Sequence, residues 1–138
     1  MGDAERLKRA GIRLTRQRLA VVRLLREAPT THMTVDQAHA LSLERGLGLP
    51  LATLYNVLND FAKRGLVRRI DMAERTTFCT DPGEHHHFLD AATGLLSAIP
   101  GPQPTVVDMP SPPDGMEIEG VDIIVRVRRA APGNENAS

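Results

Sequence analysis

Apolar and polar residues alternate at helical spacing along the first part of the chain. Residues 3–10 form a short charged segment that Gly11 closes, and Thr15 precedes a longer run that Pro29 stops. The apolar positions of this second run share one face: Leu19, Val22 and Leu25. Because Thr readily accepts hydrogen bonds from the free N–H groups at a helix start, the pattern predicts two helices, the second of them capped by Thr15.

Two further helices are predicted downstream. Thr34 and Gln37 have the spacing of a capping box, so we expect a third helix from Thr34 to about Gly46. Residues 51–64 give the clearest pattern, with Gly65 as the C-terminal stop. The apolar stripe of this fourth helix consists of Leu51, Leu54, Leu58, Phe61 and Ala62.

A β-hairpin follows the fourth helix. Residues 66–72 and 76–80 indicate two strands around a turn at Ala73-Glu74-Arg75. Three helices followed by a hairpin are typical of a winged helix. In such a fold the second helix of the helix-turn-helix motif lies in the major groove of DNA. In this chain that recognition helix would be residues 51–64.

The fourth helix presents polar groups that suit base edges. The outward residues Thr53, Tyr55, Asn56 and Asn59 can exchange hydrogen bonds with bases, and the Tyr ring can contact a thymine methyl. The same pattern fits a helix that only packs, with Tyr55 partly buried beside Leu54 and Leu58. The periodicity alone does not separate these two interpretations.

The C-terminal half predicts strands and no helix. Residues 88–99 suggest a hairpin, and in residues 121–129 apolar and polar side chains alternate. Six prolines in residues 100–113 favour an extended connection between them. We therefore expect an α+β chain with an N-terminal domain at 1–82 and a small β-rich domain at 83–138. An apolar strand leaves an edge that a second copy would cover, which predicts a homodimer.

Charge divides the chain in the same way. Residues 1–82 contain 14 of the 17 Lys and Arg but 9 of the 17 Asp and Glu, although the whole chain is neutral. A basic half suits a polyanion such as DNA, but ordinary solvated charge gives the same count. With no apolar run long enough to span a bilayer, we expect a cytoplasmic protein without membrane contact.

Metal-ligating residues are few and mostly histidine. The single Cys79 excludes paired Cys-x-x-Cys zinc motifs, and the densest cluster of potential ligands is His85-His86-His87. Side chains alternate on a strand, so His85 and His87 share a face while His86 points to the other. A set of His32, Cys79, His85 and His87 would join the two halves. Cys79 is either a soft ligand or a small buried side chain.

Several stretches together resemble the ferric uptake regulator family. They are GIRLTRQRLAVVRLL, HMTVDQ, LPLATLYNVLNDFAKRGLVRR and FCTDPGEHHHF, in order over about residues 10–90. The resemblance implies a winged-helix DNA-binding domain, a C-terminal dimerisation domain and a regulatory metal bound between them. Tyr55 would contact bases, and Arg13 would enter the minor groove.

The resemblance also indicates further residues that would contact DNA or bind the metal. Arg16 and Arg18, close to Arg13, would join it at an AT-rich operator. His32 lies where the family supplies a metal ligand from the N-terminal domain, and Cys79 falls where the family has Glu or Asp. The metal would be a divalent transition ion: iron, manganese or zinc.

Departures from the family pattern favour one branch of it. The chain has no Cys-x-x-Cys pairs, and its HHHF stretch and its ending PPDGMEIEGVDIIVRVR resemble the iron response regulator (Irr) branch, whose members respond to haem. The branch's Gly-Cys-Pro haem element is absent, so haem would have to bind through His85, His86 and His87.

These features predict a regulator of iron or haem homeostasis that responds to bound metal or haem. The alternative is a metal or haem carrier without specific DNA binding, which would leave the basic helix-turn-helix half unexplained. We do not expect an enzyme, because the sequence has no nucleophile with an adjacent base, no Gly-rich phosphate loop and no His-Glu-x-x-His pattern.

Overall fold

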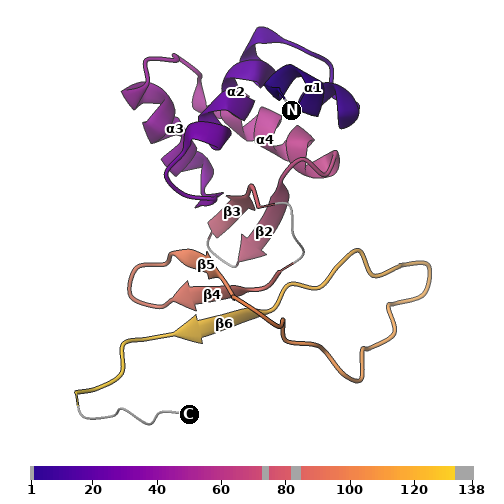
Figure 1. Ribbon diagram of the computed structural model, residues 1–138. Coiled ribbons are helices and arrows are strands. Elements are labelled where there is room, and N and C mark those ends of the chain that lie inside the picture. Colours follow the sequence, from indigo (N-terminus) through magenta and orange to yellow (C-terminus); the bar gives the residue numbers. More distant parts are fainter. Residues whose placement is uncertain (1, 73–74, 82–84, 133–138) are drawn as a thin grey trace. The chain divides into compact units, whose positions relative to one another are not determined.

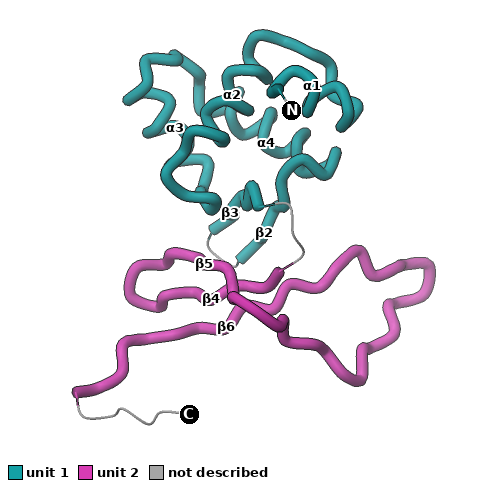
Figure 2. The backbone as a smooth tube through the Cα atoms, in the orientation of Figure 1, with its two compact units in different colours: residues 1–83 teal, residues 84–138 magenta. Residues whose placement is uncertain are grey.

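The computed structural model describes residues 2–72, 75–81 and 85–132, which form two compact units. Unit 1 comprises residues 1–83 and unit 2 residues 84–138 (Figure 2). The expected domain boundary, between residues 82 and 83, lies outside the described residues. Residues 73 and 74 of the predicted turn also lie outside them.

Unit 1 contains the four helices and the first sheet (Figure 1). Its elements are α1 (Asp3–Arg9), α2 (Arg16–Glu27), β1 (His32–Met33), α3 (Val35–Glu44), α4 (Leu51–Lys63), β2 (Arg68–Met72) and β3 (Arg75–Cys79). The three strands form an antiparallel sheet in the order β1-β3-β2. Helices α2 to α4 followed by the β2–β3 hairpin have the order of a winged helix, as the sequence predicts.

Local sequence signals set the ends of these helices. The Thr15 side chain accepts a hydrogen bond from the backbone N–H of Arg18 at 3.1 Å. The side chains of Thr34 and Gln37 each accept one from the other's backbone N–H, which completes the predicted capping box. At Gly65, where φ is 76°, the chain adopts the left-handed conformation that ends α4.

The core of unit 1 is aliphatic, with two Phe rings. Its fully buried side chains include Leu7, Val21, Leu54, Leu58, Phe61 and Phe78. The predicted stripe of α4 is wrong at its first position, because Leu51 is 43% exposed at the start of the helix. Val57 is buried instead. The buried residues of α4 therefore begin at Leu54, in the second turn of the helix, and not at its first residue.

Unit 2 is a small mixed sheet in the order β5-β4-β6. Strands β4 (His87–Asp90) and β5 (Leu96–Ala98) form the predicted hairpin, whereas β6 (Ile124–Val127) pairs with β4 in parallel. Residues 99–123 form no helix or strand, which confirms the extended connection expected from the prolines. Strand β6 is shorter than the predicted 121–129, and its Val125 and Val127 are 40% and 39% exposed in the single chain.

Candidate metal centre and nucleic-acid interface

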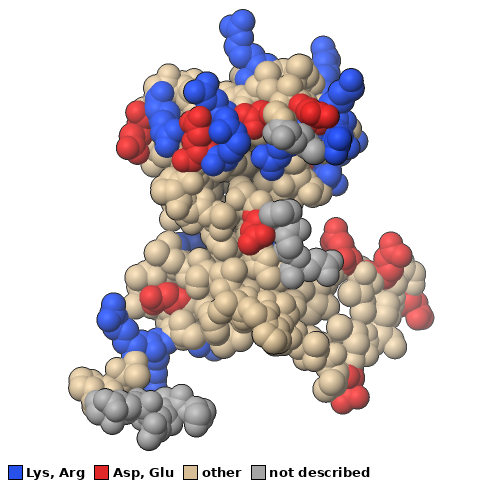
Figure 3. Space-filling model, in the orientation of Figure 1, with Lys and Arg blue, Asp and Glu red and all other residues tan. Residues whose placement is uncertain are grey.

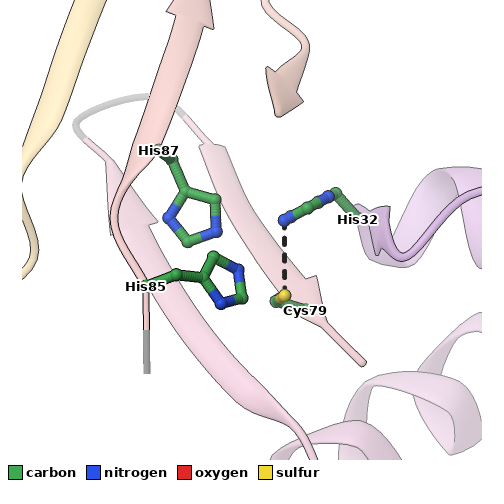
Figure 4. Close-up of side chains that lie close together, drawn as sticks. All are labelled: His32, Cys79, His85 and His87. Carbon is green, nitrogen blue, oxygen red and sulfur yellow. Dashed lines mark hydrogen bonds between the residues drawn. The ribbon is translucent and has the colours of Figure 1, made fainter. Parts of the chain in front are cut away.

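The pairing of β1 with β3 brings His32 beside Cys79. The two residues are opposite each other in the antiparallel register, and His32 Nε2 lies 3.3 Å from Cys79 Sγ (Figure 4). The other ring nitrogen, His32 Nδ1, lies 3.1 Å from the Thr31 hydroxyl. A histidine whose second nitrogen is held by a polar partner is oriented as metal-ligating histidines are.

Cys79 ends the last strand of the wing in a buried position. Its side chain is fully buried, and this burial raises the pKa of the thiol. A bound cation favours the thiolate over the thiol, so a metal would offset the effect of burial. Both interpretations of Cys79 stay compatible with the structure, since it is small and buried and also lies against an imidazole.

His85 and His87 form a second pair, within unit 2. Their ring centroids are 4.6 Å apart, and both residues are buried (Figure 4). His86 takes a different direction, because its Nδ1 accepts a hydrogen bond from the backbone N–H of Ile123 at 3.0 Å. The alternation predicted from strand geometry is therefore confirmed, and His86 has a structural role beside β6.

The candidate DNA-binding side chains lie on unit 1. Tyr55 is 44% exposed, and Asn56 is also exposed on the same helix, α4, whereas Thr53 is half-buried. The Tyr55 ring is therefore accessible from solvent on this face of α4. The packing of α4 depends on its opposite face, where Leu54, Leu58 and other apolar side chains are buried.

The three arginines expected at the DNA differ in their surroundings. Arg13, three residues before α2, and Arg16, the first residue of α2, are exposed, as expected of groups that bind phosphates or the minor groove. Arg18 instead donates a hydrogen bond from Nη1 to the Arg13 carbonyl at 2.9 Å and forms an ion pair with Asp60 of α4 at 3.6 Å. Its guanidinium therefore connects the Arg13 backbone with α4.

A groove runs beside the exposed face of α4. It is lined by the first turns of α3 and α4, including Leu51, Ala52, Tyr55 and Asn56, and by Arg75 and Thr76 of β3. Sequence reasoning missed Leu51, Ala52 and Arg75 as candidate contacts. Leu51 was assigned to the core by its spacing, and Arg75 was assigned to the turn, although it is the first residue of β3.

Basic side chains gather on unit 1. On the face drawn in Figure 3, Lys and Arg lie over the helices with Asp and Glu interspersed, whereas Asp and Glu follow the connection between β5 and β6 in unit 2. The charge division of the sequence is thus also a division between the two units. Within the described residues no helix is long and apolar enough to cross a membrane.

A helix-turn-helix with a β-hairpin wing, joined to a small β-sheet unit, defines an α+β chain of the winged-helix class. The sequence profile of the ferric uptake regulator family matches residues 9–103, which is well over half of the chain. The chain belongs to the ferric uptake regulator family. This family consists of regulators, so membership of it supports the prediction that the chain is not an enzyme.

Individual relatives agree with the family match. The ferric uptake regulation protein of Legionella pneumophila is 33% identical over 90 residues, which cover 64% of this chain and 66% of that protein. Its counterpart in Haemophilus influenzae is 31% identical over 89 residues, which cover 64% and 61%. The chain thus spans slightly less than two thirds of the length of these two relatives.

Solved structures show the same fold. The ferric uptake regulator of Pseudomonas aeruginosa, determined with manganese, superposes with a TM-score of 0.71 at 24% identity, over 95% of this chain and 100% of that one. At this identity the similarity establishes the fold, while the roles of individual residues rest on the geometry of this chain.

Proposed function

We propose that the chain is a DNA-binding transcription regulator whose affinity for DNA depends on a bound divalent transition metal. The observation that carries this proposal is the course of strand β3 through unit 1. Its first residues, Arg75 and Thr76, line the groove beside α4, and its last residue, Cys79, lies against His32. One five-residue strand therefore joins the candidate DNA surface to the candidate metal ligands.

The DNA partner is proposed to be a double-stranded, AT-rich operator. Helix α4 would enter the major groove, where Tyr55 and Asn56 are exposed for base contacts and Thr53 is partly accessible. Arg16 would bind phosphates, and Arg13 would enter a narrow minor groove, which attracts arginine most strongly in AT-rich sequence. Arg18 would act by holding the Arg13 backbone.

The metal is proposed to bind His32 and Cys79 of unit 1 together with His85 and His87 of unit 2. The described residues thus offer one thiol and three imidazoles as a possible ligand group. Cys79 and His85 are six positions apart in the sequence, so their Cα atoms cannot be more than about 22 Å apart. Iron, manganese and zinc all accept imidazole, and the thiolate favours the softer zinc and iron over manganese.

Binding by both units would give the metal a regulatory effect. A ligand shifts a conformational equilibrium only when it binds the two conformations with different affinity. A metal held by both pairs would satisfy this condition for the arrangement of the units, whereas a metal held only by His85 and His87 would not.

Haem is the second candidate for the regulatory ligand. It would place the chain in the iron response regulator branch, with a role in iron or haem homeostasis. Haem needs only axial ligands, which His85, His86 or His87 could supply. However, His85 and His87 are buried, and the His86 ring accepts a hydrogen bond from Ile123, so haem would have to displace existing contacts. The geometry therefore favours a divalent ion.

The chain is proposed to act as a homodimer through unit 2. Strand β6 is at the edge of its sheet and exposes Val125 and Val127, and the connection before it exposes Val107 and Met116. Exposed apolar side chains beside an open strand edge are typical of a surface that a second subunit covers.

A metal-binding experiment tests the ligand assignment. Metal content and affinity would be measured on the full chain, with haem titrated in parallel, for the parent, His32→Ala, Cys79→Ser and the triple alanine variant at residues 85–87. We expect each variant to lose at least about tenfold in metal affinity, since even indirect partners of metal ligands are worth about 10–100-fold. His39→Ala, in the middle of α3, is the matched control and should bind as the parent does.

The outcomes separate the proposed signals and the carrier alternative. Full metal and haem affinity in the triple variant would show that the histidines are structural. Loss of metal with retention of haem in His32→Ala would indicate two overlapping sites. Metal binding by a parent that shows no salt-dependent retention on AT-rich duplex DNA would support a carrier instead of a regulator.

A further inference from the structure

A side-chain network connects helix α4 with the wing, and Arg69 is at its centre. The Arg69 guanidinium donates from Nη1 to the Asn59 side-chain carbonyl on α4, the helix that also carries Tyr55. From Nε it donates to Asp71 Oδ1 at 2.8 Å. Asn59 was expected to point outward with Tyr55, but it lies against the wing.

The network extends across the hairpin. Asp71 is opposite Thr76 in the β2–β3 register, and the Thr76 hydroxyl donates to Asp71 Oδ1 at 2.8 Å. The bonds from Arg69 and then Thr76 hold the pKa of Asp71 below its usual value, so this carboxylate stays charged at neutral pH. Two strands of the wing are thereby linked to α4 through one guanidinium.

Only arginine has the geometry for this link. The planar guanidinium presents its N–H donors in a fixed fork, so it can bond α4 with one nitrogen and β2 with another. A lysine at the same position would keep the charge, but its single nitrogen could not reach both partners with the same geometry. Arg69 is also only 35% exposed at its side chain, less than a free surface cation.

We propose that Arg69 is a positioning residue of the DNA interface, which fixes α4, the helix that carries Tyr55, and the wing relative to each other and thereby sets sequence preference. The proposal rests on the DNA binding proposed above. A competing role is a direct phosphate contact, in which Arg69 would contribute charge and no sequence preference.

The positioning of α4 is testable without DNA, because Tyr55 lies one turn before Asn59 on this helix and is the only tyrosine in a chain without tryptophan. Tyrosine fluorescence anisotropy therefore reports on this one side chain. In the full-length protein, loaded with the same metal throughout, we expect lower Tyr55 anisotropy in Arg69→Ala, in Arg69→Lys and in Asn59→Ala. Arg9→Ala removes an exposed cation of α1 that pairs with Glu5 and should leave the signal unchanged.

The effect on DNA recognition is measured with the duplex that the parent enriches from a random-sequence pool and with a shuffled duplex. We expect Arg69→Ala and Arg69→Lys to lower the preference for the enriched duplex by roughly tenfold, within the range that one base-reading group supplies. The dependence of affinity on salt should stay as in the parent, because no phosphate contact is lost. Melting temperatures of all variants, measured in parallel, identify any variant that is not folded, and Asn59→Ala then serves in place of Arg69→Ala.

Three results would overturn the proposal. One is unchanged Tyr55 anisotropy in folded variants of Arg69. Another is full rescue of sequence preference by Arg69→Lys, which would show that charge is sufficient. The third is a slope of log affinity against log salt concentration that falls by about one while sequence preference stays as in the parent, because this result is typical of a lost phosphate contact. If the parent enriches no duplex at all, the proposed DNA binding fails, while the anisotropy result still decides whether Arg69 holds α4 around Tyr55.

Discussion

Tyr55 and Arg13 are both exposed on unit 1, but they offer different interactions to a DNA duplex. A Tyr ring meets base edges and thymine methyl groups, so its loss costs about 1–3 kcal/mol at the preferred site and relaxes sequence preference. A cation near the backbone supports binding to every sequence. We expect Tyr55→Ala to reduce mainly the preference for one DNA sequence over another. Arg13→Ala should weaken binding to all sequences and lower the slope of log affinity against log salt concentration by about one.

Titration of a preferred and a shuffled duplex at several salt concentrations separates these effects. Tyr55→Phe is the control for Tyr55→Ala because it keeps the ring and loses only the hydroxyl. Should Tyr55→Ala bind the preferred duplex as tightly as the parent, α4 would not be the recognition helix. Because a minor-groove arginine also reads the shape of AT-rich DNA, Arg13→Ala should weaken AT-rich duplexes somewhat more than others.

Single residues show where sequence reasoning reached the site and where it stopped. Residue type, together with the resemblance to the family, selected His32 and Cys79 as candidates. Their pairing depends on β1, a strand of two residues that is too short to produce a recognisable alternation. The contacts of Arg18 and Arg69 were not predictable either, because both lie between elements whose packing no local pattern specifies.

Among the elements, α3 offers the clearest test of a local signal. Its capping box satisfies two backbone N–H groups, one at Thr34 and one at Gln37. Removing such a cap costs about 1 kcal/mol. Thr34→Ala should therefore lower the free energy of unfolding by about 1 kcal/mol in urea titrations at fixed protein concentration. Thr105→Ala, at an exposed position outside any helix or strand, should have no measurable effect, and equal effects of the two changes would argue against the cap.

Helix α1 is tied to α2 through an ion pair that predicts a pH dependence. Arg26 donates to Asp3 at 3.0 Å, and this hydrogen bond holds the pKa of Asp3 below its usual value of 3.8. A lowered pKa means that the folded state favours the carboxylate, so the stabilisation is complete well above pH 3.8 and is lost as the pH falls through the lowered pKa.

Asp3→Asn should consequently lower the free energy of unfolding at pH 7, and the difference from the parent should shrink as the pH falls below about 4. Urea titrations of both proteins across this range measure it. High salt should reduce the difference at pH 7, because Arg26 is largely exposed. A difference that stays constant down to pH 2 would contradict the ion pair as its cause.

The helices were predicted more completely than the strands. Caps, glycine stops and apolar spacing are properties of neighbouring residues, so Thr15, Thr34 and Gly65 gave helix ends directly. Leu51 was misassigned because spacing cannot show that the core ends before the first turn of α4. The parallel pairing of β6 with β4 joins residues 37 positions apart, as in the pair His87 and Ile124, and no local pattern encodes it.

At the scale of the whole molecule, the two units correspond to two proposed tasks. Unit 1 holds the helix-turn-helix, the wing and the first ligand pair, and unit 2 holds the second ligand pair and the exposed β6 edge. The sequence predicted an α+β chain of this composition, and the family match and the common fold confirm it. The signal itself, metal or haem, depends on ligand geometry around an ion and could not be read from the order of residues.

The most direct test of the central claim is the affinity of the full-length chain for its preferred duplex with and without metal. Labelled duplex would be titrated with protein loaded with zinc, iron(II) or manganese, and with chelator-treated protein, at one salt concentration. Coupling between two sites is typically worth about 5–150-fold. We expect at least one metal to change the affinity of the parent by about tenfold and to have no effect on the triple alanine variant at residues 85–87. Equal affinity of the metal-loaded and metal-free parent for the duplex would contradict the account.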